Sequence, residues 1–229
     1  MNTVVNISIY GIGWIHSDGY GCIMKELQAS FVNRQSHAML KKKLFSCPFK
    51  NFGRLDTLSK MTCYAVALAL QDAGMHYSAG QKQDIGIIGT NASGSLQSDI
   101  DYFQDYLNNG RTLSRGNLFI YTLPTSPLAE AAIYFGLQGP LLYATSPDGS
   151  LASILAMATE MTLLEETPIM LAGMAEEDRA VYCVLMRSPA SDRKALCDVA
   201  KAMELVRNTG AVSEMIEEFS AFRKGNILT

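Results

Sequence analysis

The chain has 229 residues, of which 48% are hydrophobic and 18% are charged, and its formal net charge is −3. This composition predicts a folded core rather than disorder, and the lack of a basic excess argues against nucleic acid as a partner. The longest apolar runs are too short to cross a bilayer. The N-terminal residues look like a first strand rather than a signal peptide. The five cysteines lack the spacing of a metal site or of a disulfide framework. We therefore expect a cytoplasmic protein with reduced thiols and without a membrane span, cofactor or metal site.

The first quarter of the chain is predicted to start with a buried strand. Apolar and β-branched residues over 3–13 indicate a strand that runs into a glycine loop, and residues 19–31 can form a short helix. Residues 31–55 have no regular period and are expected to be irregular. Asp56 then caps a helix that ends at Gly74.

Strands and helices alternate in the remainder of the sequence. Helices are predicted over 96–110, 123–140, 149–166 and in the tail over 191–224, and strands over 84–94, 141–145, 168–176 and 180–188. This alternation predicts an α/β fold in which helices cover a layered, mixed β-sheet with buried strands.

Glycines near the predicted strand ends do not form a phosphate-binding pattern. The run that begins at Gly11 and Gly13 has His16 where G-x-G-x-x-G needs its last glycine, and the loop from Gly89 to Gly94 lacks the lysine of a P-loop. We expect these glycines to serve tight turns between strands and helices. His16, beside Trp14, is expected to be an ordinary loop histidine.

The stretch YATSPDGSLASI, residues 143–154, is typical of a strand end, a tight turn and a helix start. Ser146 can cap this helix, Pro147 suits its first position and Asp148 suits its first turn, a start worth about 1 kcal/mol for the cap. The alternative is a hydrolytic or acyl-binding site on Ser146 and Asp148. The structural interpretation is favoured because no general base is identifiable nearby.

The order and spacing of several segments resemble the N-terminal half of β-ketoacyl-acyl-carrier-protein synthases, which have the thiolase-like fold. The resemblance covers most of residues 5–187. It is carried by IYGIG, DTLSKMTCYAVALALQDAGM, DIGIIGTNASG, NLFIYTLPTSPLAEAAIYFGLQGP, PIMLAGMAEE and AVYCVLM. It implies that the chain forms half of a thiolase-like fold.

The resemblance also implies where the family's nucleophile would stand. In that family a Gly-Pro precedes a strand, the catalytic cysteine follows eight residues after the proline, and an Ala-Gly lies beyond it. Gly139-Pro140 and Ala172-Gly173 match without gaps, and the cysteine position then falls on Asp148. The family's second half, which supplies two activating histidines, has no counterpart in this sequence.

A carboxylate at this position cannot replace the thiolate of a condensing enzyme, because it is a poor acyl acceptor in water. We therefore expect a non-catalytic accessory subunit for fatty-acid or polyketide assembly that binds a ketosynthase, an acyl carrier protein or an acyl group. One alternative is a subunit of a split condensing enzyme, an acyltransferase that a partner chain completes. Another is a cryptic acyl hydrolase that uses Ser146 and Asp148.

The resemblance finally implies partners and a domain division. We expect a homodimer or a heterodimer with a ketosynthase, with LLYATS at the dimer seam. Residues 1–189 are expected to form the ketosynthase-like domain, and residues 190–229 a helical C-terminal extension packed on it. One local basic cluster, Lys41, Lys42, Lys43, Lys50 and Arg54, is either a solvated surface or a docking site for an acidic acyl carrier protein.

Overall fold

The structure of the protein is a computed structural model that describes residues 6–31, 36–78, 80–112, 115–145, 150–188, 194–207 and 209–225, with side chains described for all but 36–39. The strands are β1 (Asn6–His16), β2 (Gly19–Cys22), β3 (Leu27–Ser30), β4 (Ile85–Thr90), β5 (Leu141–Tyr143), β6 (Ile169–Ala175), β7 (Arg179–Ser188) and β8 (Cys197–Asp198). The α-helices are α1 (Ser36–Leu44), α2 (Thr57–Asp72), α3 (Leu96–Asn108), α4 (Gly116–Phe119), α5 (Ser126–Phe135), α6 (Leu151–Leu163), α7 (Val199–Val206) and α8 (Val212–Gly225). Two short 3-10 helices are η1 (Phe52–Arg54) and η2 (Ile120–Thr122).

The described strands form one mixed sheet. Its order is β3-β2-β1-β7-β6-β4-β5, and β8 pairs with β1 beside this path. β4 runs parallel to β5 and to β6, whereas β7, β1, β2 and β3 pair antiparallel with their neighbours. The predicted α/β class with a mixed sheet is confirmed.

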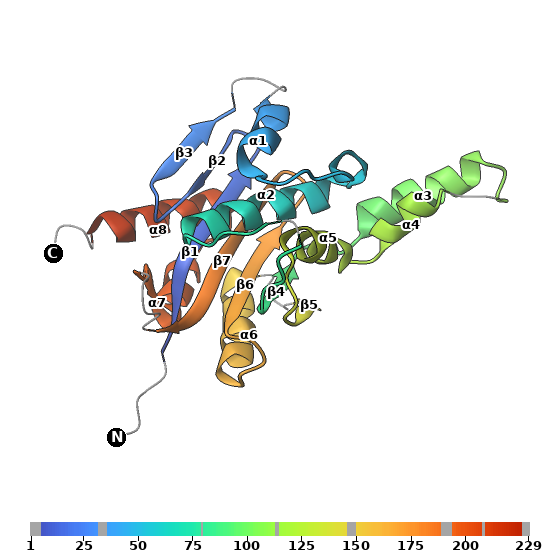
Figure 1. Ribbon diagram of the computed structural model, residues 1–229. Helices are drawn as coiled ribbons and strands as arrows, with labels where there is room; N and C mark the ends of the chain where they lie inside the picture. The colour runs from blue at the N-terminus through green and yellow to red at the C-terminus, as the bar shows by residue number, and fades with distance from the viewer. Residues whose placement is uncertain are drawn as a thin grey trace.

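Helices cover both faces of the sheet (Figure 1). α1, α2 and α5 pack on one face, where the core includes Tyr10, Leu68 and Tyr182. α6, α7 and α8 pack on the other face, where the core includes Trp14, Leu155 and Phe219. Every residue of β4 is buried, as expected for a strand that has helices on both sides.

The first strand does not stop at its glycines, as the sequence predicted, but continues through them to His16. Gly11 and Gly13 face α2, and they allow β1 to approach the backbone of that helix. A Cβ atom at Gly13 would lie 2.1 Å from the backbone nitrogen of Ala69. These two glycines therefore serve close packing of a strand on a helix rather than a turn.

Residues 19–31 form a hairpin of β2 and β3, and the predicted helix is wrong. The turn between the strands is held by Asp72 at the end of α2. Its carboxylate accepts backbone N–H bonds from Met24 at 2.9 Å and from Lys25 at 2.9 Å, and a third from Ile12 in β1 at 2.8 Å. A side chain 47 or more residues away thus stabilises the hairpin, and local sequence could not reveal this contact.

Residues 31–55 contain more regular structure than predicted, namely α1 and η1. The start of α2 agrees with its prediction, because the Asp56 carboxylate accepts a bond from the Ser59 backbone nitrogen at 2.8 Å. Gly74 follows the helix with a φ of +66°, as its predicted stop requires. Phe45, Phe52 and Tyr64 join α1, η1 and α2 through aromatic ring contacts.

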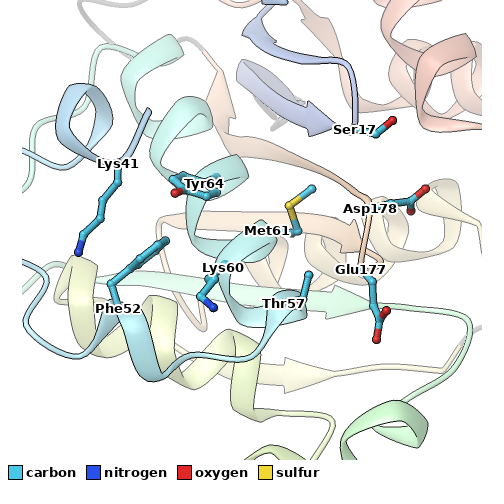
Figure 2. Close-up of a pocket in the computed structure, with 9 residues that line it drawn as sticks. All are labelled: Ser17, Lys41, Phe52, Thr57, Lys60, Met61, Tyr64, Glu177 and Asp178. Atoms are coloured by element: carbon cyan, nitrogen blue, oxygen red, sulfur yellow. The ribbon is translucent and has the colours of Figure 1, made fainter. Parts of the chain in front are cut away.

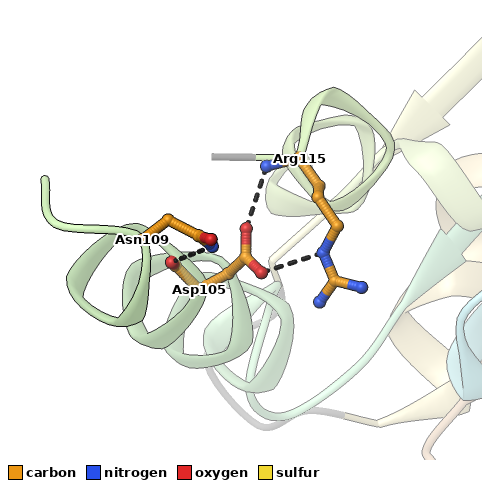
Figure 3. Close-up of polar contacts among 3 residues, drawn as sticks. All are labelled: Asp105, Asn109 and Arg115. Carbon is orange, nitrogen blue, oxygen red and sulfur yellow. Dashed lines mark hydrogen bonds and ion pairs between the residues drawn. The ribbon is translucent and has the colours of Figure 1, made fainter. Parts of the chain in front are cut away.

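α3 and α4 form an arm that extends from the body of the fold beyond the N-terminal end of α2 (Figure 1). The arm is held by Asp105 of α3, whose carboxylate accepts bonds from the Arg115 backbone nitrogen at 2.9 Å and from its Nε at 2.8 Å (Figure 3). Asn109 also donates to the Asp105 carbonyl at 2.8 Å. These contacts tie the end of α3 to the start of α4.

The C-terminal part of the described chain adds to the same core. β8 pairs with β1 at Ser8 and Ile9, and α7 packs against α6. The predicted boundary at residues 189 and 190 lies outside the described residues, and the two-part division stays a prediction. Within the described ranges, each helix is too short or too polar to cross a lipid bilayer.

Candidate functional site

The junction between β5 and α6 is the site that the sequence singles out. Ser146, Pro147, Asp148 and Gly149 lie outside the described residues, so the roles predicted for Ser146 and Asp148 stay predictions. The flanks are described: the Ala144 backbone nitrogen donates to the Gly89 carbonyl at 3.0 Å. This contact places the end of β5 beside the end of β4.

The start of α6 differs from its prediction in one respect. The helix begins at Leu151, and its cap is Ser150, whose hydroxyl accepts a bond from the Ser153 backbone nitrogen at 3.3 Å. The sequence named Ser146 for this role and did not single out Ser150. Ser146 itself lies outside the described residues, and its role stays a prediction.

Four of the five cysteines lie in environments that disfavour the thiolate form, and the fifth lies in a different segment from the junction. Burial raises the pKa of Cys22 and of Cys197 to about 12, and it also raises the pKa of Cys63 and of Cys183. Cys47, the fifth, is half-buried in the segment between α1 and η1. A condensing nucleophile needs a depressed thiol pKa, so none of these four thiols fits that role.

The histidines offer little more. His16 stacks on Trp14 with ring centroids 5.1 Å apart, and its Nδ1 accepts a bond from the Asp18 backbone nitrogen at 3.0 Å. This contact serves the turn between β1 and β2, in agreement with the expected structural role. His76 is exposed after the end of α2, and the side chain of His37 is not among those described.

A polar groove of about 440 Å³ opens at the carboxyl ends of β4 and β6. Ligands of α/β proteins commonly bind at this edge of a parallel sheet. The loop after β4 is fixed by Asn91, whose Oδ1 accepts bonds from the Gly94 backbone nitrogen at 2.7 Å and from the Tyr143 hydroxyl at 2.8 Å. Glu176, at the end of β6, accepts the Ala92 backbone N–H at 2.8 Å.

The lining of this groove is polar and carries more acidic than basic groups. Among the described residues that line it there are four carboxylates and one guanidinium but no cysteine or histidine. The sequence reasoning overlooked Asn91 and Glu176, although an asparagine three residues before a glycine is a recognisable turn signal. Groups of His, Cys, Asp and Glu suited to a metal do not occur within the described part of the chain.

The five basic residues of the predicted cluster come from α1 and from the segment around η1. Lys42, Lys43, Lys50 and Arg54 are exposed, and Lys41 is half-buried. The Lys41 ammonium lies 4.9 Å from the centroid of the Phe52 ring, and the Lys43 ammonium lies 5.8 Å from that of Tyr20. Lys41 and Lys43 therefore pack on aromatic rings, which a fully solvated surface would not require.

Comparisons with known proteins identify one family that this sequence matches and one fold that it shares with solved structures. Residues 21–202 match the family described as β-ketoacyl synthase, N-terminal domain. The sequence matched no curated protein.

Several solved structures have the same fold. The ishigamide ketosynthase/chain length factor is 14% identical with a TM-score of 0.64, and the match covers 84% of this chain and 65% of that one. A β-ketoacyl synthase from Burkholderia phymatum STM815 is 16% identical with a TM-score of 0.59, covering 85% and 63%. A type II polyketide synthase acyl carrier protein in complex with its ketosynthase is 13% identical with a TM-score of 0.60, covering 85% and 62%.

This chain thus spans less than two thirds of the length of those structures. At such low identity they establish the fold, which is that of the thiolase-like ketosynthases, as the sequence predicted. The family match extends over most of the sequence. The chain belongs to the β-ketoacyl synthase N-terminal domain family.

Proposed function

We propose that this chain is a non-catalytic accessory subunit that binds a ketosynthase in the assembly of fatty acids or polyketides. The observation that carries the proposal is an apolar surface on the α3–α4 arm and on the neighbouring edge of the sheet. The partner follows from the family and from the open strand edge, and the lack of catalysis follows from the residues at the expected site.

The α3–α4 arm exposes an unusual number of large apolar side chains. In α3 these residues recur with helical spacing, so that they share one face of the helix. The exposed set, which we call the apolar arm surface, consists of Leu96, Ile100, Phe103, Leu107, Phe119, Ile120 and Leu123, with exposed fractions from 36% to 59%. An apolar group of this size on a folded protein is typical of an interface.

The edge of the sheet beside this arm is also open. β5 pairs with β4 on one side and is the last strand of the sheet. Leu141 and Leu142 are 37% and 42% exposed, and Ile133 of α5 is 79% exposed. An edge strand with exposed leucines is suited to pair with a strand of another chain.

A ketosynthase is the partner that the family supports best. One solved structure with this fold is itself named a ketosynthase/chain length factor. The family resemblance places the strand before the nucleophile at the dimer seam, and in this chain that strand is β5. A stable complex buries about 1,200–2,000 Å² of solvent-accessible surface over both partners. The apolar arm surface and the open edge of β5 can both contribute to this area.

The absence of catalysis is inferred from the chemistry of the expected site. The family's cysteine position falls on Asp148, and burial raises the pKa of four of the five thiols. A carboxylate at that position does not carry an acyl group stably in water. The partner is therefore the chain that would perform the condensation.

An acyl carrier protein is the second partner that we propose, at the exposed residues of the basic cluster. Lys42, Lys50 and Arg54 can attract an acidic carrier by long-range electrostatics. Such an attraction weakens as salt screens the charges.

The proposal is tested by co-expression with the ketosynthase encoded nearest to this chain's gene, followed by light scattering on the purified pair. We expect a stable complex that Phe103→Glu weakens at least tenfold, because the substitution places a charge in the apolar arm surface. The matched control is Gln104→Glu, on an exposed polar position of the same helix. The pair should condense acyl and malonyl carrier substrates equally well with Asp148→Ala.

Three results would contradict the proposal. Equal binding by the Phe103→Glu and Gln104→Glu variants would exclude the apolar arm surface. Turnover of carrier substrates by the isolated chain would exclude a non-catalytic role. Labelling by an acyl phosphonate that Ser146→Ala abolishes would instead support the hydrolase alternative.

A further inference from the structure

A second cavity, of about 540 Å³, lies between the N-terminal half of α2, α1 and the turns that follow β1 and β6 (Figure 2). It adjoins the polar groove but differs from it in lining. Its volume lies within the range of sites for small organic ligands. The accessory function proposed above does not use this cavity.

The floor of the cavity is apolar and rigid. Phe52, Met61 and Tyr64 line it, and their exposed fractions are 6%, 5% and 3%. The rings of Phe52 and Tyr64 lie 5.3 Å apart, and both contact Phe45 in the core. Because these side chains are held by the core, the floor exists before any ligand binds, which lowers the entropic cost of binding.

Two ammonium groups lie on one side of this floor. Lys41 and Lys60 stand beside Phe52, and the Lys41 ammonium is 4.9 Å from the centre of that ring (Figure 2). The ion pairs within the described part of the chain include neither lysine. Both are partly buried, so the attraction of either ammonium group for an anion would be less screened than on an open surface.

The opposite side of the cavity is acidic. Glu177 and Asp178, in the turn between β6 and β7, lie across from the lysines (Figure 2). Asp178 is paired with Arg179 at 2.9 Å, whereas Glu177 takes part in none of the ion pairs of the described residues. A second anionic group at this side of a ligand would be repelled.

We propose that this cavity binds an organic anion that has one acidic head and an apolar body. The head lies at the ammonium groups of Lys41 and Lys60, which flank Phe52, and the body lies on Phe52, Met61 and Tyr64. The carboxylate of Glu177 at the far side selects against dicarboxylates. A carboxylate with an alkyl tail meets each of these conditions.

Sodium decanoate, below the concentration at which it forms micelles, is a suitable probe. Methyl-¹³C labelling of the methionines reports binding, because Met61 lies in the floor and its signal is assigned with a Met61→Leu variant. We expect saturable shifts of the Met61 signal, and smaller shifts at methionines elsewhere in the core. Decanol and decyltrimethylammonium should bind at least tenfold more weakly than decanoate, since neither offers an anion to the lysines.

Paired variants test the two lysines. Lys41→Gln with Lys60→Gln should weaken decanoate binding by about tenfold or more. Lys82→Gln with Lys194→Gln removes the same charge from exposed positions outside the cavity and should leave the affinity unchanged. Thermal unfolding of both double variants checks that they fold.

Two further measurements complete the test. Glu177→Gln should reduce the ratio between the affinity for decanoate and the affinity for the corresponding α,ω-dicarboxylate, because the substitution removes a charge that repels the second carboxylate. An unshifted Met61 signal at saturating decanoate would overturn the proposal. Equal loss of affinity in the two double variants, or equal binding of decanol, would also overturn it.

Discussion

The close approach of β1 to α2 makes a specific prediction at Gly13. A Cβ atom there would lie 2.1 Å from the Ala69 nitrogen and 2.5 Å from the Ala65 carbonyl oxygen, whereas ordinary contacts begin at 3.4 Å. All of these obstructing atoms belong to the backbone of α2, so no side chain can rotate away. The helix would have to move by about 1.3 Å to accept one methyl group.

We expect Gly13→Ala to lower the free energy of unfolding by about 3 kcal/mol, the upper part of the range for an overpacked core. The loss is a large share of a typical stability of about 5–15 kcal/mol. Urea unfolding followed by circular dichroism measures it from the shift in midpoint at constant slope. The control is Gly53→Ala, because a Cβ atom there meets nothing within 4 Å.

A change below about 0.5 kcal/mol for Gly13→Ala, similar to that of a neutral surface substitution, would refute this reasoning. It would mean that α2 can move away from β1 at little cost. α2 also carries Met61 and Tyr64, so such freedom would deform the floor of the cavity described above. Gly53→Ala should stay within about 0.5 kcal/mol of the wild type.

Three other perturbations test separate parts of the structure. Asp72→Ala removes the acceptor of three backbone N–H groups and should destabilise the fold by about 3 kcal/mol or more in urea unfolding. Burial raises the pKa of Asp72 against the opposing effect of these donors, so the folded state binds its proton more tightly than the unfolded state. Protonated Asp72 therefore stabilises the fold below about pH 4, and this stabilisation is lost as the pH rises through the pKa that Asp72 has in the folded state. If the difference in free energy of unfolding between wild type and Asp72→Asn did not change with pH, this reasoning would be contradicted. Asp105→Ala should cost about 1 kcal/mol and speed hydrogen exchange at the Arg115 amide, and unchanged exchange would show that the arm is held by other contacts. The raised pKa values of Cys22 and Cys197, about 12, should make these thiols react with a thiol reagent at pH 8 at least about tenfold more slowly than in urea. Equal rates would contradict the raised pKa values.

Sequence periodicity was a reliable guide where an element has strong local signals. Asp56 and Gly74 mark the two ends of α2 in the sequence, and the structure has a side-chain cap at the first and a positive φ at the second. The predicted strand and helix periods in the second half of the chain also agree with β4, β5, β6 and β7 and with α3, α5 and α6. The sequence did not predict α4 and η2, and the predicted helical tail contains the short strand β8. These signals depend on residues within one or two turns of each other, which is why they can be read directly from the chain.

The errors occurred where distant residues decide the conformation. The stretch over 19–31 looked helical, but it pairs as β2 and β3 beside β1 and is tied to Asp72. The Asp72 carboxylate that holds this hairpin lies at the end of α2. Tertiary contacts therefore override the local helical preference of this stretch.

The candidate site shows the same division. The carboxylate at residue 148, the family membership and the basic cluster are properties of residue identity, and the sequence alone establishes or predicts them. The polar groove between Arg54 and Glu176, the apolar arm surface and the cavity between Lys41 and Glu177 bring together residues that lie far apart in the chain. Tertiary packing determines those sites, because burial, close approach and the distance between charges exist only once the strands and helices are assembled.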